Sequence, residues 1–239
     1  MNVTWALAGA AVGAITGNQL RRSVFRLSVD RQDAPRTGCP QCGTMLRSLP
    51  LPSPRGRCRR CGARIGPRAA ILELATAVSL AFLGGGIGPR PELVGFAWLA
   101  AVGVALAAID LKVYRLPDRL TYPAFVVVLA SFAGGAVTGT DPASLQRAAF
   151  GALVLGGSYL LLAVIQPGQL GLGDVKLAAL LGLALGWVSW PVLMFGGCLA
   201  FIVSAMVSLV LIALRRISLK SALPFGPFML AGAAVALIV

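Results

Sequence analysis

The chain has 239 residues, of which 57% are hydrophobic and only 12% are charged, and its mean hydropathy is +0.84. Roughly a quarter of the residues of a soluble domain are charged. This composition therefore excludes an ordinary soluble enzyme, a disordered chain and a disulfide-rich secreted scaffold, and it indicates a polytopic membrane protein. The sequence contains no histidine, which excludes Ser-His-Asp catalysis, Cys-His catalysis and histidine-ligated metal sites.

Eight apolar stretches have about the 17 to 25 residues that a helix needs to cross a bilayer. They predict an all-α polytopic membrane protein with about eight transmembrane helices. The spacing of the cysteines between residues 39 and 61 adds a small cytoplasmic zinc-ribbon-like loop to this fold. Near Trp187–Pro191 the pattern also allows one long kinked helix, and the glycines at 84–86 and 134–135 indicate frayed helix ends or loops. The predicted spans are 2–20, 70–88, 92–110, 120–138, 146–166, 174–190, 192–214 and 222–239.

The basic residues predict the orientation of these spans. Residues 21–69 contain twelve arginines, and the chain carries a formal net charge of +13. If this segment is cytoplasmic and eight spans alternate, 19 of the 21 basic residues lie on the cytoplasmic side and only Arg90 and Arg147 lie outside. We therefore predict an uncleaved first helix at 1–20 with its N-terminus outside, a cytoplasmic loop at 21–69 and a membrane domain at 70–239. Because topology accounts for the charge and the loop lacks interleaved aromatic residues, we expect no nucleic-acid partner.

The cytoplasmic loop contains two Cys-x-x-Cys pairs, each followed by a glycine. Cys39 and Cys42 form the first pair, and Cys58 and Cys61 form the second, fifteen residues further on. This spacing is typical of a four-thiolate zinc ribbon, in which four protein ligands leave no open catalytic position. Disulfides or free thiols are the alternative, although disulfides are disfavoured in the cytoplasm. We expect a structural zinc ion.

Three carboxylates are predicted to lie at the cytoplasmic face of the membrane. Asp110 ends the third span, Asp118 precedes the fourth and Asp174 opens the sixth. Acidic residues at such positions are costly and usually functional. Two carboxylates on different helices at one depth suit an aspartyl protease, in which one takes a proton from water while the other polarises the scissile carbonyl. Because the helix dipole disfavours an anion at a C-terminus, we hypothesise that Asp110 carries the shared proton and Asp174 the charge.

Each of these residues also has a simpler interpretation. Asp118 is predicted to be the N-cap of the fourth span, Lys176 could be a topogenic charge or a lipid contact, and Glu73 could pair with an arginine of the loop. Asp110 and Asp174 could be helix caps or ion ligands in a transporter. The alternative function is therefore a non-proteolytic ion or proton transporter with a zinc-ribbon docking loop. Transport carboxylates tend to lie near the bilayer midplane, so their predicted position at span ends favours proteolysis.

The ordered set of motifs resembles the prepilin peptidases, the leader peptidase / N-methyltransferase family that processes type IV prepilins and pseudopilins. The resemblance covers most of the chain. It rests on the two cysteine pairs, on Asp110, and on four segments: Glu73-Leu74-Ala75-Thr76-Ala77, Leu116-Pro117-Asp118-Arg119-Leu120-Thr121-Tyr122-Pro123, Gly171-Leu172-Gly173-Asp174-Val175-Lys176-Leu177 and Pro224-Phe225-Gly226-Pro227-Phe228.

This resemblance implies an intramembrane aspartyl endopeptidase in the cytoplasmic membrane of a prokaryote. It implies cleavage after the glycine that ends a short basic leader, at the cytoplasmic face, with Asp110 and Asp174 as the catalytic pair. The remaining matched residues are expected to support the site: Asp118, Gly171, Gly173, Lys176 and Glu73. In many members the same protein then methylates the new N-terminus with S-adenosylmethionine, an activity with which the cysteine loop is associated.

Overall fold

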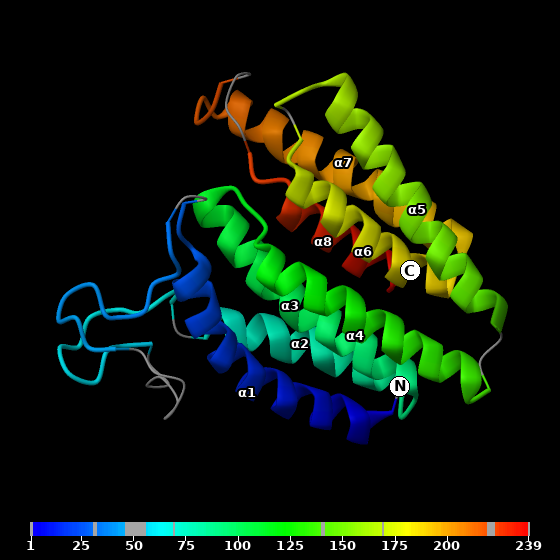
Figure 1. The fold of residues 1–239 in the computed structure, drawn as a ribbon, viewed down its shortest axis with the longest axis horizontal. Coiled ribbons are helices and arrows are strands. Elements are labelled where there is room, and N and C mark those ends of the chain that lie inside the picture. Colours follow the sequence, from blue (N-terminus) through cyan, green and yellow to red (C-terminus); the bar gives the residue numbers. More distant parts are fainter. Residues whose placement is uncertain are drawn as a thin grey trace. The chain divides into compact units, whose positions relative to one another are not determined.

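The computed structural model describes residues 2–30, 33–45, 56–68, 70–139, 142–168, 170–218 and 223–238. In these ranges the chain forms eight α-helices and, apart from two isolated β-bridges, no strand (Figure 1). The predicted all-α fold is therefore confirmed. The helices are α1 (Val3–Leu27), α2 (Ile71–Ile87), α3 (Pro91–Val113), α4 (Asp118–Val137), α5 (Pro142–Ile165), α6 (Leu172–Val188), α7 (Trp190–Ala213) and α8 (Gly226–Ala236).

Within the described ranges, four helices are long and apolar enough to cross a membrane: α3, α4, α5 and α7, with 20 to 24 residues each. The helices α2 and α8 are apolar but shorter, with 17 and 11 residues. Helix α1 continues past the predicted end of its span to Leu27, so its last turns carry the arginines at 21, 22 and 26. Length and composition therefore support half of the eight predicted spans directly.

The chain divides into two compact units, Met1–Val113 and Tyr114–Val239. In the first unit, α1 and α2 pack closely along a row of glycines spaced four residues apart, at positions 9, 13 and 17. A Cβ atom on Gly13 would lie 2.6 Å from the Cα atom of Ala77, so only glycine fits there. The Thr76 hydroxyl donates to the Gly13 carbonyl at 2.6 Å across the same contact. Small residues and interhelical hydrogen bonds are how membrane helices associate.

Helix α3 contacts both α1 and α2 and completes the first unit. Because α2 runs back from the cysteine loop and α3 follows it after a short turn, α3 ends at the side where the loop joins α1 and α2 (Figure 1). The buried carboxylate of Asp110 is thus carried at the loop end of the unit.

In the second unit, α5 and α6 pack antiparallel, with their backbones almost in contact at Gly151 and Gly182. Near the end of this contact Arg147 closes the end of α6, because its guanidinium donates to the carbonyls of Gly186 at 2.8 Å and Trp187 at 2.7 Å. These are orphan carbonyls of a helix C-terminus. Helix α4 packs on α6 where the rings of Phe132 and Trp187 stack with centroids 4.5 Å apart.

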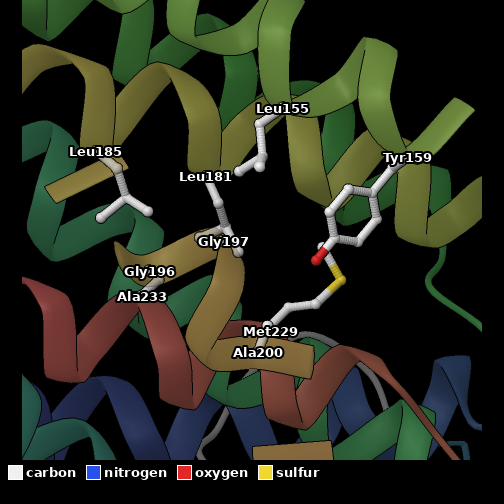
Figure 2. A pocket seen from close by; sticks show the side chains of 9 residues that line it. All are labelled: Leu155, Tyr159, Leu181, Leu185, Gly196, Gly197, Ala200, Met229 and Ala233. Atoms are coloured by element: carbon white, nitrogen blue, oxygen red, sulfur yellow. The ribbon is translucent and has the colours of Figure 1, made fainter. Parts of the chain in front are cut away.

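A small cavity lies among α5, α6, α7 and α8 of the second unit (Figure 2). Its volume is about 10 Å³ and its lining is almost entirely apolar. A space of this size is just enough for one water molecule, which would need polar partners. The cavity is therefore a packing gap and not a peptide site. It is lined by Leu155, Tyr159, Leu181, Leu185, Gly196, Gly197, Ala200, Met229 and Ala233.

Two local predictions are settled by these helices. The glycines at 84–86 and 134–135 lie in the last turns of α2 and α4, so their prediction as helix ends agrees with the structure and the alternative prediction as loops is wrong. Gly84 is needed for packing, because a Cβ atom there would lie 2.4 Å from the carbonyl oxygen of Trp5. The chain breaks at Ser189, which is the C-cap of α6 and the N-cap of α7, so 174–214 forms two helices and not one kinked helix.

Candidate active site and cysteine cluster

Asp174 lies in the first turn of α6, as predicted. The backbone N–H of Gly171 donates to the Oδ2 atom of Asp174 at 3.0 Å, so the carboxylate is the hydrogen-bond acceptor for the residue that precedes the helix. A carboxylate in a first turn also interacts favourably with the helix dipole. The side chain is partly buried. The turn thus holds an acidic group at a helix end by one backbone hydrogen bond.

The two glycines before Asp174 differ in their surroundings. A Cβ atom on Gly173 would lie 3.1 Å from the Cβ atom of Leu116, so this glycine permits a close approach to the segment that precedes α4. A Cβ atom on Gly171 would lie 3.3 Å from the Asp174 carboxylate and otherwise meets little. Gly173 therefore serves packing, whereas Gly171 contributes its backbone N–H.

Asp118 is not an N-cap, in contrast to its simpler sequence interpretation. It is the first residue of α4, the N-cap is Pro117, and the helix end has no side-chain cap. Instead the Asp118 Oδ1 atom accepts a hydrogen bond from Lys176 Nζ at 2.7 Å. The same ammonium group lies 5.0 Å from the centre of the Tyr122 ring. The structure thus joins two of the predicted supporting residues, Asp118 and Lys176.

Asp110 lies in the last turn of α3, where the sequence places it, and its side chain is 4% exposed. Its neighbours Leu106 and Ile109 are fully buried. A carboxylate in such surroundings is costly, which makes Asp110 a candidate functional residue. Asp110 belongs to the first compact unit, whereas Asp118, Gly171, Gly173, Asp174 and Lys176 belong to the second.

Glu73 forms an ion pair with Arg21, so the predicted pairing with an arginine is confirmed. That arginine lies inside α1, because the helix extends beyond the predicted boundary at residue 20. The Arg21 side chain is 1% exposed and packs on two glycines of the cysteine loop. A Cβ atom on Gly56 would lie 2.5 Å from its NH1 atom, and one on Gly66 would lie 2.9 Å from its Cγ atom. Arg21 therefore connects α1, α2 and the loop.

The four loop cysteines form one cluster, with all Sγ atoms within 4.8 Å of one another. Each pair sits on a turn of the same design. The N–H of Cys39 donates to Thr44 O at 2.9 Å and the N–H of Cys58 donates to Ala63 O at 2.7 Å, with an isolated β-bridge beside each turn. Gly43 and Gly62 close the turns at φ values of 66° and 72°, a conformation that favours glycine.

The cluster fits a zinc ion. Four thiolates facing one point are the ligand set of a structural zinc site. The Thr44 hydroxyl, 3.2 Å from Cys42 Sγ, leads the hydrogen bonds that lower the pKa of this thiol to about 6. Thiolate, and not thiol, is the metal-binding form. The Phe25 ring of α1 packs against the buried side of the cluster with Ile65.

Sequence reasoning missed the roles of two residues. Arg21 was counted only among the twelve topogenic arginines, and only its position four residues after Gly17 could have indicated a buried face of α1. Tyr122 belongs to a motif segment, but the sequence assigned it no role of its own. Its spacing of four residues from Asp118 places both side chains on one face of α4, where Lys176 reaches them.

Comparisons with known proteins cover both parts of the chain. The sequence model of the type IV leader peptidase family matches residues 94–206, which include Asp110, Asp118, Asp174 and Lys176. The model of the bacterial peptidase A24 N-terminal domain matches residues 11–84, which include the four clustered cysteines and Glu73. No solved structure matches.

Curated relatives extend these matches over most of the chain. The prepilin leader peptidase/N-methyltransferase of Burkholderia pseudomallei (strain K96243) is 35% identical over 216 residues, which is 85% of this chain and 67% of the relative. That of Aeromonas hydrophila is 35% identical over 212 residues, covering 85% and 71%. That of Dickeya chrysanthemi is 30% identical and covers 98% of this chain and 92% of the relative. With such identity and coverage, together with the acidic and cysteine motifs, this chain belongs to the type IV leader peptidase family.

Proposed function

We propose that the chain is a prepilin leader peptidase, an intramembrane aspartyl endopeptidase that removes the short basic leader of type IV prepilins or pseudopilins. The family supports the reaction class and the substrate class. The observation that carries the catalytic assignment is the placement of Asp110 and Asp174, each partly or fully buried at the end of an apolar helix and each inside the family match. The comparisons do not favour the transport alternative.

In the proposed reaction the two carboxylates share one proton. The ionised carboxylate takes a proton from a water molecule, whose oxygen attacks the scissile carbonyl carbon, while the protonated carboxyl hydrogen-bonds to the carbonyl oxygen. The tetrahedral intermediate then collapses, the C–N bond breaks and the proton passes to the leaving amine. Helix dipoles favour the anion at Asp174, in a first turn, and the proton at Asp110, in a last turn.

We infer that the reaction takes place at the cytoplasmic face of the inner membrane. Eight spans with the N-terminus outside would put the cysteine loop, Asp110 and Asp174 on the side that carries 19 of the 21 basic residues. An uncleaved leader lies on this side as well. The glycine at 171 would leave room for a substrate backbone beside Asp174, because a Cβ atom there would meet little besides the Asp174 carboxylate.

We further propose a structural zinc ion on Cys39, Cys42, Cys58 and Cys61. It would supply folding energy to a loop of few large apolar residues, as structural zinc does in other small domains. The names of the relatives include N-methyltransferase, so we propose that the chain also methylates the new N-terminus with S-adenosylmethionine. No residue of the chain is assigned to that cofactor.

A cleavage assay with purified protein in liposomes tests these proposals. A prepilin from the same genome is incubated with the wild type, Asp110→Asn, Asp174→Asn and Cys58→Ser, and the products are identified by mass. We expect the wild type to remove the leader and either asparagine variant to lose at least about 1000-fold in rate, as variants lacking a catalytic group do. With S-adenosylmethionine added as the methyl donor, a methyl mass on the product, absent with Cys58→Ser, would support the transferase.

Two outcomes would contradict the proposal. Cleavage by both asparagine variants would show that the catalytic residues lie elsewhere. Failure of the wild type on every prepilin of the genome would overturn the peptidase function itself. Cys198→Ser is the matched control for Cys58→Ser, because Cys198 is an exposed cysteine of α7 outside the cluster.

A further inference from the structure

The first turns of α4 and α6 are joined by a cluster of three side chains, which we call the lysine bridge: Asp118, Tyr122 and Lys176. Lys176 comes from α6, and its ammonium group lies 2.7 Å from the Asp118 carboxylate and 5.0 Å from the Tyr122 ring centre. Asp118 and Tyr122 are one helical turn apart on α4, so they contact the ammonium group from one face of that helix. The lysine bridge therefore ties one turn of α6 to one turn of α4.

The lysine bridge lies next to the proposed catalytic carboxylate. Lys176 follows Asp174 by two residues, in the same first turns of α6. On the other side of Asp174, Gly173 packs on Leu116, just before α4 begins. The turn that carries Asp174 is thus attached to residues 116–122 at two points, one apolar and one charged.

This turn has few other constraints. The first N–H groups of a helix lack partners inside the helix, and here the backbone bonds that begin α6 are those from Asp174 and Val175 to Gly171 O, at 3.0 and 3.3 Å. Glycines at 171 and 173 lower the resistance of the backbone to rearrangement. A side chain that fixes this turn from outside would therefore decide how the Asp174 carboxylate is aimed.

The lysine bridge is too exposed to be a major source of stability. The side chains of Lys176 and Asp118 are 31% and 54% exposed, and exposed ion pairs contribute about 0 to 1 kcal/mol. Catalysis is more sensitive to geometry, since a displacement of about 1 Å can cost 100-fold in rate. Loss of the bridge is therefore expected to affect turnover more than folding.

We propose that Lys176 is a positioning residue, which, by bridging Asp118 and Tyr122 of α4, holds the first turn of α6 and the Asp174 carboxylate in the orientation that cleavage requires. This inference rests on the proposed peptidase function. Lys176 acts through Asp174 and does not touch the substrate.

Steady-state kinetics on a prepilin test the proposal. Lys176→Met keeps the length of the side chain and removes its charge, and we expect kcat to fall about 10- to 100-fold with KM unchanged. Asp118→Asn should have a similar effect, and the double variant should be no slower than the slower single variant, because both remove one interaction. Lys176→Arg should retain most of the activity. Arg119→Gln is the control, since it removes an exposed positive charge beside Asp118.

Amide hydrogen exchange gives a measurement that does not depend on activity. We expect residues 172–175 to exchange faster in Lys176→Met and in Asp118→Asn than in the wild type and in Arg119→Gln, while the melting temperature of all four proteins stays the same. This comparison also tests the inference if the wild type cleaves no prepilin, so the failure of the two proposals can be distinguished.

Three results would overturn the inference. An unchanged kcat in Lys176→Met would show that the lysine bridge does not position the site. A rise in KM with normal kcat in Asp118→Asn would indicate instead that Asp118 binds the basic leader. Unchanged exchange of residues 172–175 in both variants would show that the turn is held by other contacts.

Discussion

At the scale of single residues, the buried pair of Arg21 and Glu73 is the most consequential ionic contact of the first unit. Arg21 is 1% exposed and Glu73 is 18% exposed, and the second carboxylate oxygen of Glu73 is buried without a hydrogen-bond partner among the described residues. Removing one member of a buried pair strands the other charge and costs about 3 to 5 kcal/mol, whereas replacing both by apolar residues is often nearly neutral. Replacing only one of the two residues is therefore expected to lower stability more than replacing both.

We accordingly predict that Arg21→Met lowers the free energy of unfolding by about 3 kcal/mol, since it leaves the Glu73 carboxylate in an apolar contact between α1 and α2. The double variant Arg21→Met/Glu73→Leu should recover most of this loss. Chemical unfolding of the purified protein in detergent, followed by circular dichroism, measures both values.

The adjacent arginine provides the control for this prediction. Arg22→Met removes the same charge from the same turn of α1 but leaves the ion pair intact, and we expect it to change stability little. Equal losses in Arg21→Met and Arg22→Met would show that net charge, and not the buried pair, is responsible. A double variant that is less stable than Arg21→Met would also contradict the prediction.

At the scale of helices, close approach of backbones explains where the glycines occur. A Cβ atom on Gly13 would lie 2.6 Å from the Cα atom of Ala77 and 2.6 Å from the carbonyl oxygen of Thr76, both backbone atoms of α2. Backbone atoms cannot move aside without shifting the whole helix. Gly157, in the middle of α5, has no heavy atom within 4 Å of such a Cβ position. The two glycines thus form a matched pair for substitution.

We predict that Gly13→Ala destabilises the protein by about 1 to 3 kcal/mol, the usual cost of overpacking a tight contact. Gly157→Ala should be neutral or stabilise the protein by about 0.5 to 1 kcal/mol, because alanine is the better helix former. Both values come from unfolding in detergent. If the two substitutions had the same effect, close packing of α1 on α2 would not be the reason for glycine at position 13.

The helices also show what the sequence could and could not predict. Apolar length predicted the eight helices, and the predicted separation of 174–190 from 192–214 is confirmed, because Ser189 and Pro191 interrupt the pattern. The glycines at 84–86 lie in the last turn of α2, and their prediction as a loop was wrong because propensity alone makes glycine a helix breaker. At Gly84 the cost is offset by packing on α1, and a single sequence does not reveal which helix lies opposite.

The candidate site was predictable to a similar degree. The spacing of the cysteines was sufficient to predict their cluster, since two Cys-x-x-Cys-Gly turns specify their own local geometry. Asp118 was misread as an N-cap because local sequence favours that role, whereas its partner Lys176 is 58 residues away. Long-range pairs of this kind depend on which helices pack together, so they become visible only in the structure.

At the scale of the whole molecule, the number of membrane spans decides on which side each loop lies. Four helices meet the length and hydropathy of a span by themselves, and the eight-span topology needs α1, α2, α6 and α8 as well. The charges favour eight, because alternation then leaves 19 of 21 basic residues on the cytoplasmic side. Short apolar helices can still span where the bilayer thins or flanking residues reach the interface.

Reporter fusions test this topology. We predict that phosphatase fused after Arg90 or Gly139 is active, because the eight-span topology places both points outside. Green fluorescent protein fused after Arg119, Gly168 or Ser218 should fluoresce, because the same topology places these points inside. The physical reason is the excess of arginine and lysine in the inside loops. The control is the other reporter at each point. Green fluorescent protein after Arg90 or Gly139 should not fluoresce, and phosphatase after Arg119, Gly168 or Ser218 should be inactive.

The fusion after Arg119 discriminates most sharply between the two span counts. If only α3, α4, α5 and α7 crossed the membrane and the cysteine loop remained cytoplasmic, Arg90 would lie inside and Arg119 outside. That arrangement would carry Lys112, Arg115 and Arg119 to the outer face, against the positive-inside rule. It would also put Asp110 and Asp118 on the side opposite to an uncleaved leader. Phosphatase activity after Arg119 would therefore contradict both the eight-span topology and the proposed cleavage at the cytoplasmic face.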